Sequence, residues 1–214
     1  MIDATGLKTT SMEDFADALA GPDPVPGGGG VSAYAAALGA ALGSMVCALT
    51  TGKKKYAETQ GELDEIIPKL EAYRKRFIDG IKEDAESFLP LAKAYSLPET
   101  TPEEKERKEE VMEELLLKAA ETPLSLMCDI SECLVLLERL AEIGSRLAIS
   151  DVGVGAAMCR AAMESASLNV FINTKYMKNR EKAASLNDEA TELVSGAQVL
   201  SEDILKQVRG ALEG

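Results

Sequence analysis

The chain has 214 residues and a formal net charge of −13, and 46% of its residues are hydrophobic. The negative charge disfavours nucleic acid and anionic membrane surfaces as partners, because both would repel it. Five Tyr, four Phe and no Trp leave the core to Ala, Leu, Val, Ile and Met, which suits close-packed helices better than a sheet. The chain has no histidine, so acid–base chemistry would fall to Asp, Glu, Lys, Tyr or Cys.

The cysteines and the N-terminus indicate a cytoplasmic protein. The four cysteines have no CxxC spacing, and a zinc site without any imidazole is not expected, so we predict free buried thiols in a reducing compartment and no metal. The opening stretch MIDATGLKTTSMEDF carries acids early and lacks an apolar core, so it is not a signal peptide. The cysteines are Cys47, Cys128, Cys133 and Cys159.

The first part of the chain predicts a short helix and then a strongly apolar one. Thr10 and Glu13 form a capping box that opens the short helix. Residues 31–50 carry no charge, and Gly39 and Gly43 form a GxxxG spacing that lets neighbouring helices approach closely. This segment passes the length test for a membrane span. Because amphipathic segments surround it, we instead expect a soluble helix that is buried on all sides.

The remaining segments also show helical spacing of apolar residues. One helix is predicted from Gln60 to about Leu97, with Pro68 and Pro90 as points at which it kinks or divides. Thr101-Pro102-Glu103-Glu104 is a strong helix start. We predict further helices over residues 101–121, 123–149, 150–176 and 182–212. No stretch alternates with period two, so the class is all-α, as one antiparallel bundle of about six to seven helices in a single domain over residues 1–214.

Asp84 is the carboxylate whose position is most informative. It continues the apolar stripe of Phe77 and Ile81, with Phe88 four residues further on. A carboxylate that faces inward is rare unless it is paired, hydrogen-bonded or in use. The alternative is a slightly rotated helix in which Asp84 lies at the margin of the stripe and pairs with a lysine.

Asn169 and Asn173 are four residues apart and share one helix face. Paired amides suit a heterocycle that offers donors and acceptors, and hydrogen bonds between helices explain the pair equally well. Asp151 stands where a helix is predicted to begin. Capping is the default explanation for an Asp there, although such a carboxylate can also bind a cation or accept a hydrogen bond.

Two segments could hold an anionic ligand. In GKKKY, three lysines follow the uncharged helix, where they also complement the helix C-terminus. In PVPGGGGVSAY, four glycines precede that helix and could direct N–H groups at an anion or form a packing turn. No GK[ST] follows the glycines and no strand precedes them, so neither a Walker loop nor a dinucleotide fold is indicated. These residues are Lys53, Lys54 and Lys55, and Gly27, Gly28, Gly29 and Gly30.

Taken together, these stretches resemble the cyclodeaminase/cyclohydrolase family of tetrahydrofolate one-carbon enzymes. The matching segments occur in the family's order: PGGGGVSAYAAALGAALGSMVCALTTGKKKY, DAESFLPLAKAYSLPETTPEEKERK, AAETPLSL, ISDVGVGAAM and SLNVFIN. One branch converts formiminotetrahydrofolate to methenyltetrahydrofolate, and the other interconverts methenyl- and formyltetrahydrofolate. The deaminase branch usually reads PGGGS, whereas this chain has Gly30 at the serine position, which favours the cyclohydrolase branch.

The resemblance implies an all-helical homodimer with a folate cleft near the subunit interface and no metal or redox cofactor. The expected activity is methenyltetrahydrofolate cyclohydrolase, with formiminotetrahydrofolate cyclodeaminase and a non-catalytic folate binder as alternatives. Asp84 would be the base, and Asp151 would orient it or pair with the substrate cation. Asn169 and Asn173 would recognise the pterin, and the glycine N–H groups would approach it. Lys53 to Lys55 would attract the glutamate tail, most usefully a polyglutamate one.

Overall fold

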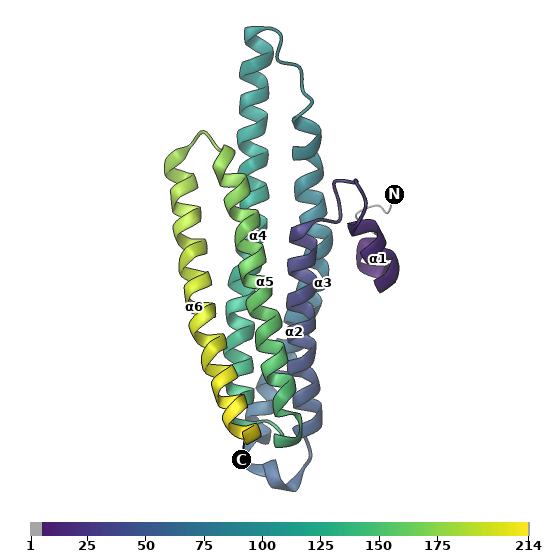
Figure 1. The fold of residues 1–214 in the computed structure, drawn as a ribbon, viewed down its shortest axis with the longest axis vertical. Helices are drawn as coiled ribbons and strands as arrows, with labels where there is room; N and C mark the ends of the chain where they lie inside the picture. The colour runs from purple at the N-terminus through teal and green to yellow at the C-terminus, as the bar shows by residue number, and fades with distance from the viewer. Residues whose placement is uncertain (1–5, 214) are drawn as a thin grey trace.

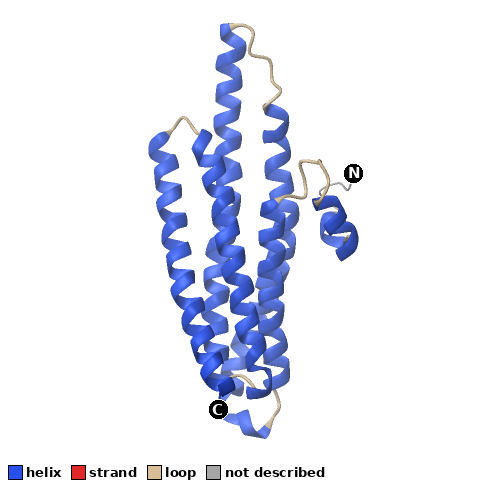
Figure 2. Ribbon diagram, viewed as in Figure 1, coloured by secondary structure: helices blue, strands red, loops and turns tan. Residues whose placement is uncertain are grey.

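The computed structural model describes residues 6–213, and all regular structure within that range is helical (Figures 1 and 2). The all-α prediction is confirmed. The long helices alternate in direction, so they form an antiparallel bundle (Figure 1). The α-helices are α1 (Met12–Leu19), α2 (Gly28–Thr50), α3 (Gln60–Ala94), α4 (Pro102–Ile143), α5 (Ile149–Tyr176) and α6 (Arg180–Glu213), and the 3-10 helices are η1 (Leu7–Thr9), η2 (Lys54–Thr59) and η3 (Arg146–Ala148).

The arrangement of the long helices sets where a site can form. Helix α5 packs against α2, α4 and α6, and α2 also packs against α3. The hairpin of α3 and α4 rises past the start of α2, and the short α1 lies beside that end of the bundle (Figure 1). The ring of Phe15 on α1 lies 5.8 Å from that of Tyr34 on α2, which attaches α1 to the bundle. The start of α2 is therefore flanked by α1, α3 and α5.

Glycines let α2 and α5 approach closely, as the GxxxG spacing predicted. A Cβ on Gly39 would lie 2.9 Å from the carbonyl oxygen of Gly155 and 2.5 Å from Sγ of Cys159. The prediction that α2 is buried on all sides is wrong, because Leu38 and Leu49 are about 40% exposed. By length and composition α2 could cross a membrane, yet half of its most apolar window is buried, as in the core helix of a soluble protein.

The predicted helix break before Pro123 is wrong, because α4 is a single helix of 42 residues that continues through this proline. Proline has no N–H, so the carbonyl of Ala119, four residues earlier, loses its helical donor. Nδ2 of Asn173 on α5 donates to this carbonyl at 3.0 Å and replaces the missing bond. A side chain from a distant segment thus keeps the helix continuous, which local sequence rules could not reveal.

Several predicted helix starts shift in the structure. Helix α2 begins at Gly28, so three of the four glycines lie in its first turn and do not precede it. Helix α1 is capped by Ser11, not Thr10, because the Ser11 hydroxyl accepts from the backbone N–H of Asp14 at 3.0 Å. The predicted helix start at Thr101-Pro102-Glu103-Glu104 is confirmed for α4, where Thr101 and Glu104 form a capping box.

The start of α5 also differs from the prediction. Asp151 does not cap this helix, which begins at Ile149 without a side-chain cap, directly after η3. Asp151 instead lies within the first turn. Among the cysteines, Cys128 is exposed, so the prediction of four buried thiols is wrong for that residue.

Because the hydrogen bond from Asn173 to the Ala119 carbonyl replaces the one that Pro123 cannot donate, the effect of mutating Asn173 on stability should depend on Pro123. Asn173→Ala leaves the buried Ala119 carbonyl without a donor, and we expect a loss of about 1–3 kcal/mol in the free energy of unfolding. In a Pro123→Ala background the N–H of residue 123 supplies the helical bond, so the same change should be clearly milder. Urea unfolding of the four proteins measures this coupling, and equal losses in both backgrounds would contradict it.

Candidate functional site

A cleft of about 380 Å³ opens where the start of α2 meets α3 and α5. It brings together residues that lie far apart in the chain: the glycine run, Asp84 and the two asparagines. Gly30 does not line this cleft, because it lies one position further into α2 and is buried against α3. The lining residues are Pro24, Gly27, Gly28, Gly29, Asp84, Ser87, Phe88, Tyr95, Ala119, Asn169, Ile172, Asn173 and Tyr176.

The glycine run gives the carboxylate of Asp84 room to lie against the backbone of α2. A Cβ on Gly29 would lie 1.9 Å from Oδ1 of Asp84, so no other residue type fits while the carboxylate stays in place. At Gly28 a Cβ would lie 3.4 Å from the Asn169 amide nitrogen, which is a tight contact. None of these glycines has a positive φ, so they provide space and not an unusual backbone conformation.

Asp84 is held in an environment that favours its neutral form. Burial raises the pKa of its carboxyl group to about 6. A hydrogen bond from the backbone N–H of Gly30 has the smaller, opposite effect, because it favours the ionised form. None of the ion pairs among the described residues involves Asp84, so the alternative of a lysine partner does not apply. A carboxylate with a pKa near 6 is ionised at neutral pH and is still basic enough to accept a proton.

The two asparagines divide their groups between the fold and the cleft. Asn173 donates from Nδ2 to the carbonyls of Ala119 at 3.0 Å and Asn169 at 2.7 Å, so both of its amide hydrogens are used within the protein. Asn169 donates from Nδ2 to the carbonyl of Ser165 at 2.9 Å. Neither Oδ1 accepts a hydrogen bond from the described residues. The amide pair therefore offers the cleft mainly acceptors, and the expectation of interhelical bonding holds for Asn173.

Aromatic residues form a part of the cleft that the sequence reasoning did not assign to the site. Tyr95 at the end of α3 and Tyr176 at the end of α5 line it, and both are about half exposed. Phe88 was assigned to the apolar core stripe, yet it also faces the cleft. Tyr176 follows Asn169 by seven residues and Asn173 by three, so helical spacing could have placed it on the same face. Flat apolar walls with acceptors between them suit a planar heterocycle.

The other predicted site residues lie at the opposite end of the chain's fold. Lys53 to Lys55 follow the end of α2, about 33 Å along the helix from Gly28 at 1.5 Å per residue. Asp151 lies in the first turn of α5, about 27 Å along that helix from Asn169. Within one chain the structure does not bring these residues to Asp84. The predicted helices over residues 31–50 and 150–176 already implied these separations, because a helix rises 1.5 Å per residue.

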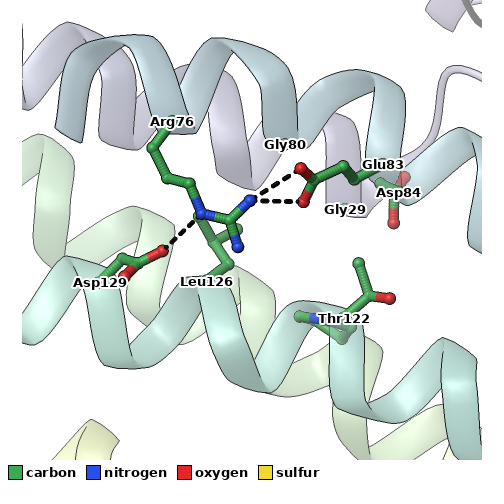
Figure 3. Close-up of a pocket in the computed structure, with 9 residues that line it drawn as sticks. Gly29, Arg76, Gly80, Glu83, Asp84, Thr122, Leu126 and Asp129 are labelled. Atoms are coloured by element: carbon green, nitrogen blue, oxygen red, sulfur yellow. Dashed lines mark hydrogen bonds and ion pairs between the residues drawn. The ribbon is translucent and has the colours of Figure 1, made fainter. Parts of the chain in front are cut away.

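A second, smaller cavity lies on the other side of Asp84, between α3 and α4 (Figure 3). Its volume is about 20 Å³. Arg76 crosses one side of it, where Nη1 donates to the Glu83 carboxylate at 2.7 Å and Nε donates to Asp129 at 3.2 Å. The lining residues are Gly29, Arg76, Gly80, Glu83, Asp84, Thr122, Pro123, Leu126 and Asp129.

The fold and the cleft define a helical-bundle protein with a carboxylate, two asparagines and aromatic side chains around one cleft. Comparison with known families is more specific. The model of the family described as Formiminotransferase-cyclodeaminase matches residues 11–192, and the chain belongs to this family.

Individual relatives come from both branches. The chain is 39% identical over 93% of its length to a methenyltetrahydrofolate cyclohydrolase from Methylorubrum extorquens, of which it covers 96%. It is 34% identical over 90% of its length to the formimidoyltransferase-cyclodeaminase of Gallus gallus, of which it spans only 36%. The crystal structure of formiminotetrahydrofolate cyclodeaminase from Thermotoga maritima superposes with a TM-score of 0.77 at 28% identity, covering 96% of both chains.

One added methyl group should change the pKa of Asp84 when it is placed at Gly29 and leave that pKa nearly unchanged when it is placed at Gly30. In Gly29→Ala the methyl group takes the place of the Asp84 carboxylate, which must move out into the cleft. We therefore expect the pKa of Asp84 to fall from about 6 toward its ordinary value. In Gly30→Ala the nearest atoms are at least 3.6 Å away, so the carboxylate stays and its pKa changes little. Carboxyl-labelled NMR titration measures both variants, and an unchanged pKa in Gly29→Ala would contradict the role of this glycine.

Proposed function

We propose that this protein is a methenyltetrahydrofolate cyclohydrolase, which hydrolyses 5,10-methenyltetrahydrofolate reversibly to 10-formyltetrahydrofolate. The observation that carries the proposal is the carboxylate of Asp84, held against Gly29 in the wall of a cleft of about 380 Å³. The similarity to the Methylorubrum extorquens cyclohydrolase, over nearly the whole of both chains, supports this substrate.

The chemistry needs a base more than it needs an activating metal. The methenyl bridge is a cationic amidinium carbon and is already electrophilic. Asp84 removes a proton from a water molecule as the oxygen attacks this carbon, which gives a neutral amino-alcohol. The bond from carbon to N5 then breaks while Asp84 returns a proton to N5, and the remaining hydroxyl proton leaves to form the formyl group. No metal or redox cofactor takes part in this scheme, and that remains a prediction.

The cleft provides for the rest of the substrate. Tyr95, Tyr176 and Phe88 bound a space in which the pterin ring can lie between apolar surfaces. The Oδ1 atoms of Asn169 and Asn173 accept hydrogen bonds from the amino and N–H groups of the ring. Binding in this orientation holds the methenyl carbon near Asp84, so the attack becomes effectively intramolecular.

The cyclodeaminase reaction is the second candidate, and the Gallus gallus and Thermotoga maritima relatives favour it. The residue at position 30 weighs against it. A Cβ at Gly30 would lie 3.9 Å from Oδ2 of Asp84, so a serine hydroxyl at this position could reach the carboxylate. This chain lacks that hydroxyl, which sets its site apart from the PGGGS pattern. A folate binder without catalysis is the third candidate.

We also propose a cytoplasmic homodimer. The neighbouring helices α2 and α5 both expose large apolar side chains, and α2 has no charged residue. A two-fold axis across the middle of α2 would lay the Lys53–Lys55 end of one copy beside the glycine run of the other. The lysines would then attract the glutamate tail of the folate, and Asp151 would approach the cleft of the partner copy. The exposed side chains are Leu38, Met45 and Leu49 of α2 and Val154, Leu168 and Ile172 of α5.

A paired assay with both folates tests the proposed function. We expect the wild-type protein to hydrolyse methenyltetrahydrofolate, seen as loss of its chromophore, and to release no ammonia from formiminotetrahydrofolate. Asp84→Asn should lower the cyclohydrolase rate by about 10²–10⁴-fold, because the base is removed. For the wild-type protein, kcat/KM should fall about tenfold per pH unit below a pH of about 6 and stay level above it. Wild-type activity in Asp84→Asn would end the assignment of the base.

Unfolding measurements on Asp84→Asn serve as the control for its fold. The folded-state pKa of Asp84 lies above the unfolded value, so folding takes up a proton between about pH 4 and pH 6. The ionised carboxylate therefore lowers stability above about pH 6, and this penalty disappears below about pH 4. We expect Asp84→Asn to be as stable as wild type at low pH and about 1–3 kcal/mol more stable at pH 7. If Asp84→Asn is inactive and shows this gain in stability, the variant is folded, and its loss of activity is not caused by unfolding.

The dimer has its own test. Light scattering should give twice the chain mass for the wild-type protein and the chain mass for Leu49→Glu, because a buried charge without a partner opposes association. The preference for polyglutamylated over monoglutamylated folate should be lost in Leu49→Glu and in a variant with Ala at positions 53, 54 and 55. A wild-type monomer that keeps this preference would contradict the shared site.

A further inference from the structure

Asp84 stands in a wall between two hollow spaces. Together with Gly29 it lines the folate cleft on one side and the small cavity between α3 and α4 on the other. Gly29 has no side chain to fill the boundary, and Gly80, one turn before Asp84 on α3, also lines the small cavity. The carboxyl group can therefore be reached from both sides.

The small cavity continues toward the outside of the bundle. Its volume of about 20 Å³ is enough for a single water molecule, and carboxylates, a guanidinium and a hydroxyl supply polar partners. Arg76, Glu83 and Thr122 line this cavity and also an open groove of about 450 Å³ on the outer surface of α3 and α4. Shared lining residues thus connect the cleft to the small cavity at Asp84, and connect this cavity to the groove that is open to solvent.

The proposed reaction requires such a connection. Each turnover breaks both O–H bonds of one water molecule, forms a C–O bond at the methenyl carbon and breaks the bond from that carbon to N5. One of the two protons ends on N5 and the other must leave the site. Folate fills the open side of Asp84 during these steps, because the reacting carbon has to lie there.

We propose that water enters and the proton leaves through the passage between α3 and α4, behind Asp84. This inference rests on the proposed function. Leu126 borders the inner cavity, and the ion pair of Arg76 with Glu83 lies across its outer side (Figure 3). Thr122 is a positioning residue, because it lines both the cavity and the groove. Its hydroxyl donates to the carbonyl of Lys118 at 3.0 Å and can still accept a hydrogen bond from a water molecule.

Filling the cavity tests the passage without touching the cleft. Leu126→Phe should occupy the space behind Asp84, and Leu126→Met is the matched control of similar volume. With methenyltetrahydrofolate as substrate, we expect Leu126→Phe to lower kcat at least tenfold, to leave KM within about twofold, and to increase the rate ratio between H2O and D2O. Leu126→Met should stay within about twofold of wild type in all three quantities.

A second variant covers the case in which Leu126→Phe fails to fold. Thr122→Val keeps the shape of the side chain and removes its hydroxyl, so kcat should fall several-fold with a raised isotope effect and unchanged KM. An active wild type with unchanged kcat in both variants would overturn the passage and leave the proposed function standing. A raised KM together with lost stability would also overturn it, since that pattern indicates a packing role. A wild type without cyclohydrolase activity would overturn both proposals.

Discussion

The contact between the Asp84 carboxylate and the backbone of Gly29 is the constraint on which the site depends. It requires α2 and α3 to approach so closely that one missing Cβ decides whether the carboxyl group fits. That approach in turn depends on small residues where the two helices meet, since a Cβ on Gly80 of α3 would lie 3.3 Å from Cβ of Ala33 on α2. The uncharged, Ala-rich and Gly-rich character of α2 is therefore part of how Asp84 is positioned, and not only of how the core is filled.

The sequence predicted the elements better than the site. Apolar spacing located the start of α3 at Gln60 and its end within about three residues, and the helix start signal Thr101-Pro102-Glu103-Glu104 marked the start of α4 correctly, because both signals are local. The same local rules failed at Pro123, where the donor that replaces the missing N–H comes from Asn173, 50 positions along the chain. They failed for a similar reason at Asp151, where a typical capping residue lies inside the first turn.

The site was predicted in part, for reasons that individual residues make clear. Asp84 could be identified because a carboxylate interrupts an apolar stripe, and Gly28 and Gly29 because a glycine run precedes a helix. The predicted helix between the glycines and Lys53 to Lys55 already placed the lysines about 33 Å away along α2, so grouping them in one site needed a second copy of the chain. Sequence alone does not reveal the cavity behind Asp84, because its walls are contributed by α3 and α4, whose relative register is a property of the packed bundle.

The charge of the proposed substrate and the environment of Asp84 fit together over one reaction cycle. In the empty cleft, burial raises the pKa of the carboxyl group to about 6. A bound methenyl cation would favour the ionised form further, so the carboxylate would stay unprotonated and ready to act as the proposed base. Attack by water removes the positive charge from the substrate, and the pKa of Asp84 rises again at the moment when it must hold a proton. A fixed ammonium or guanidinium partner would keep the pKa low through every step. Because none of the ion pairs among the described residues involves Asp84, the proposed substrate would itself control the protonation of this carboxylate.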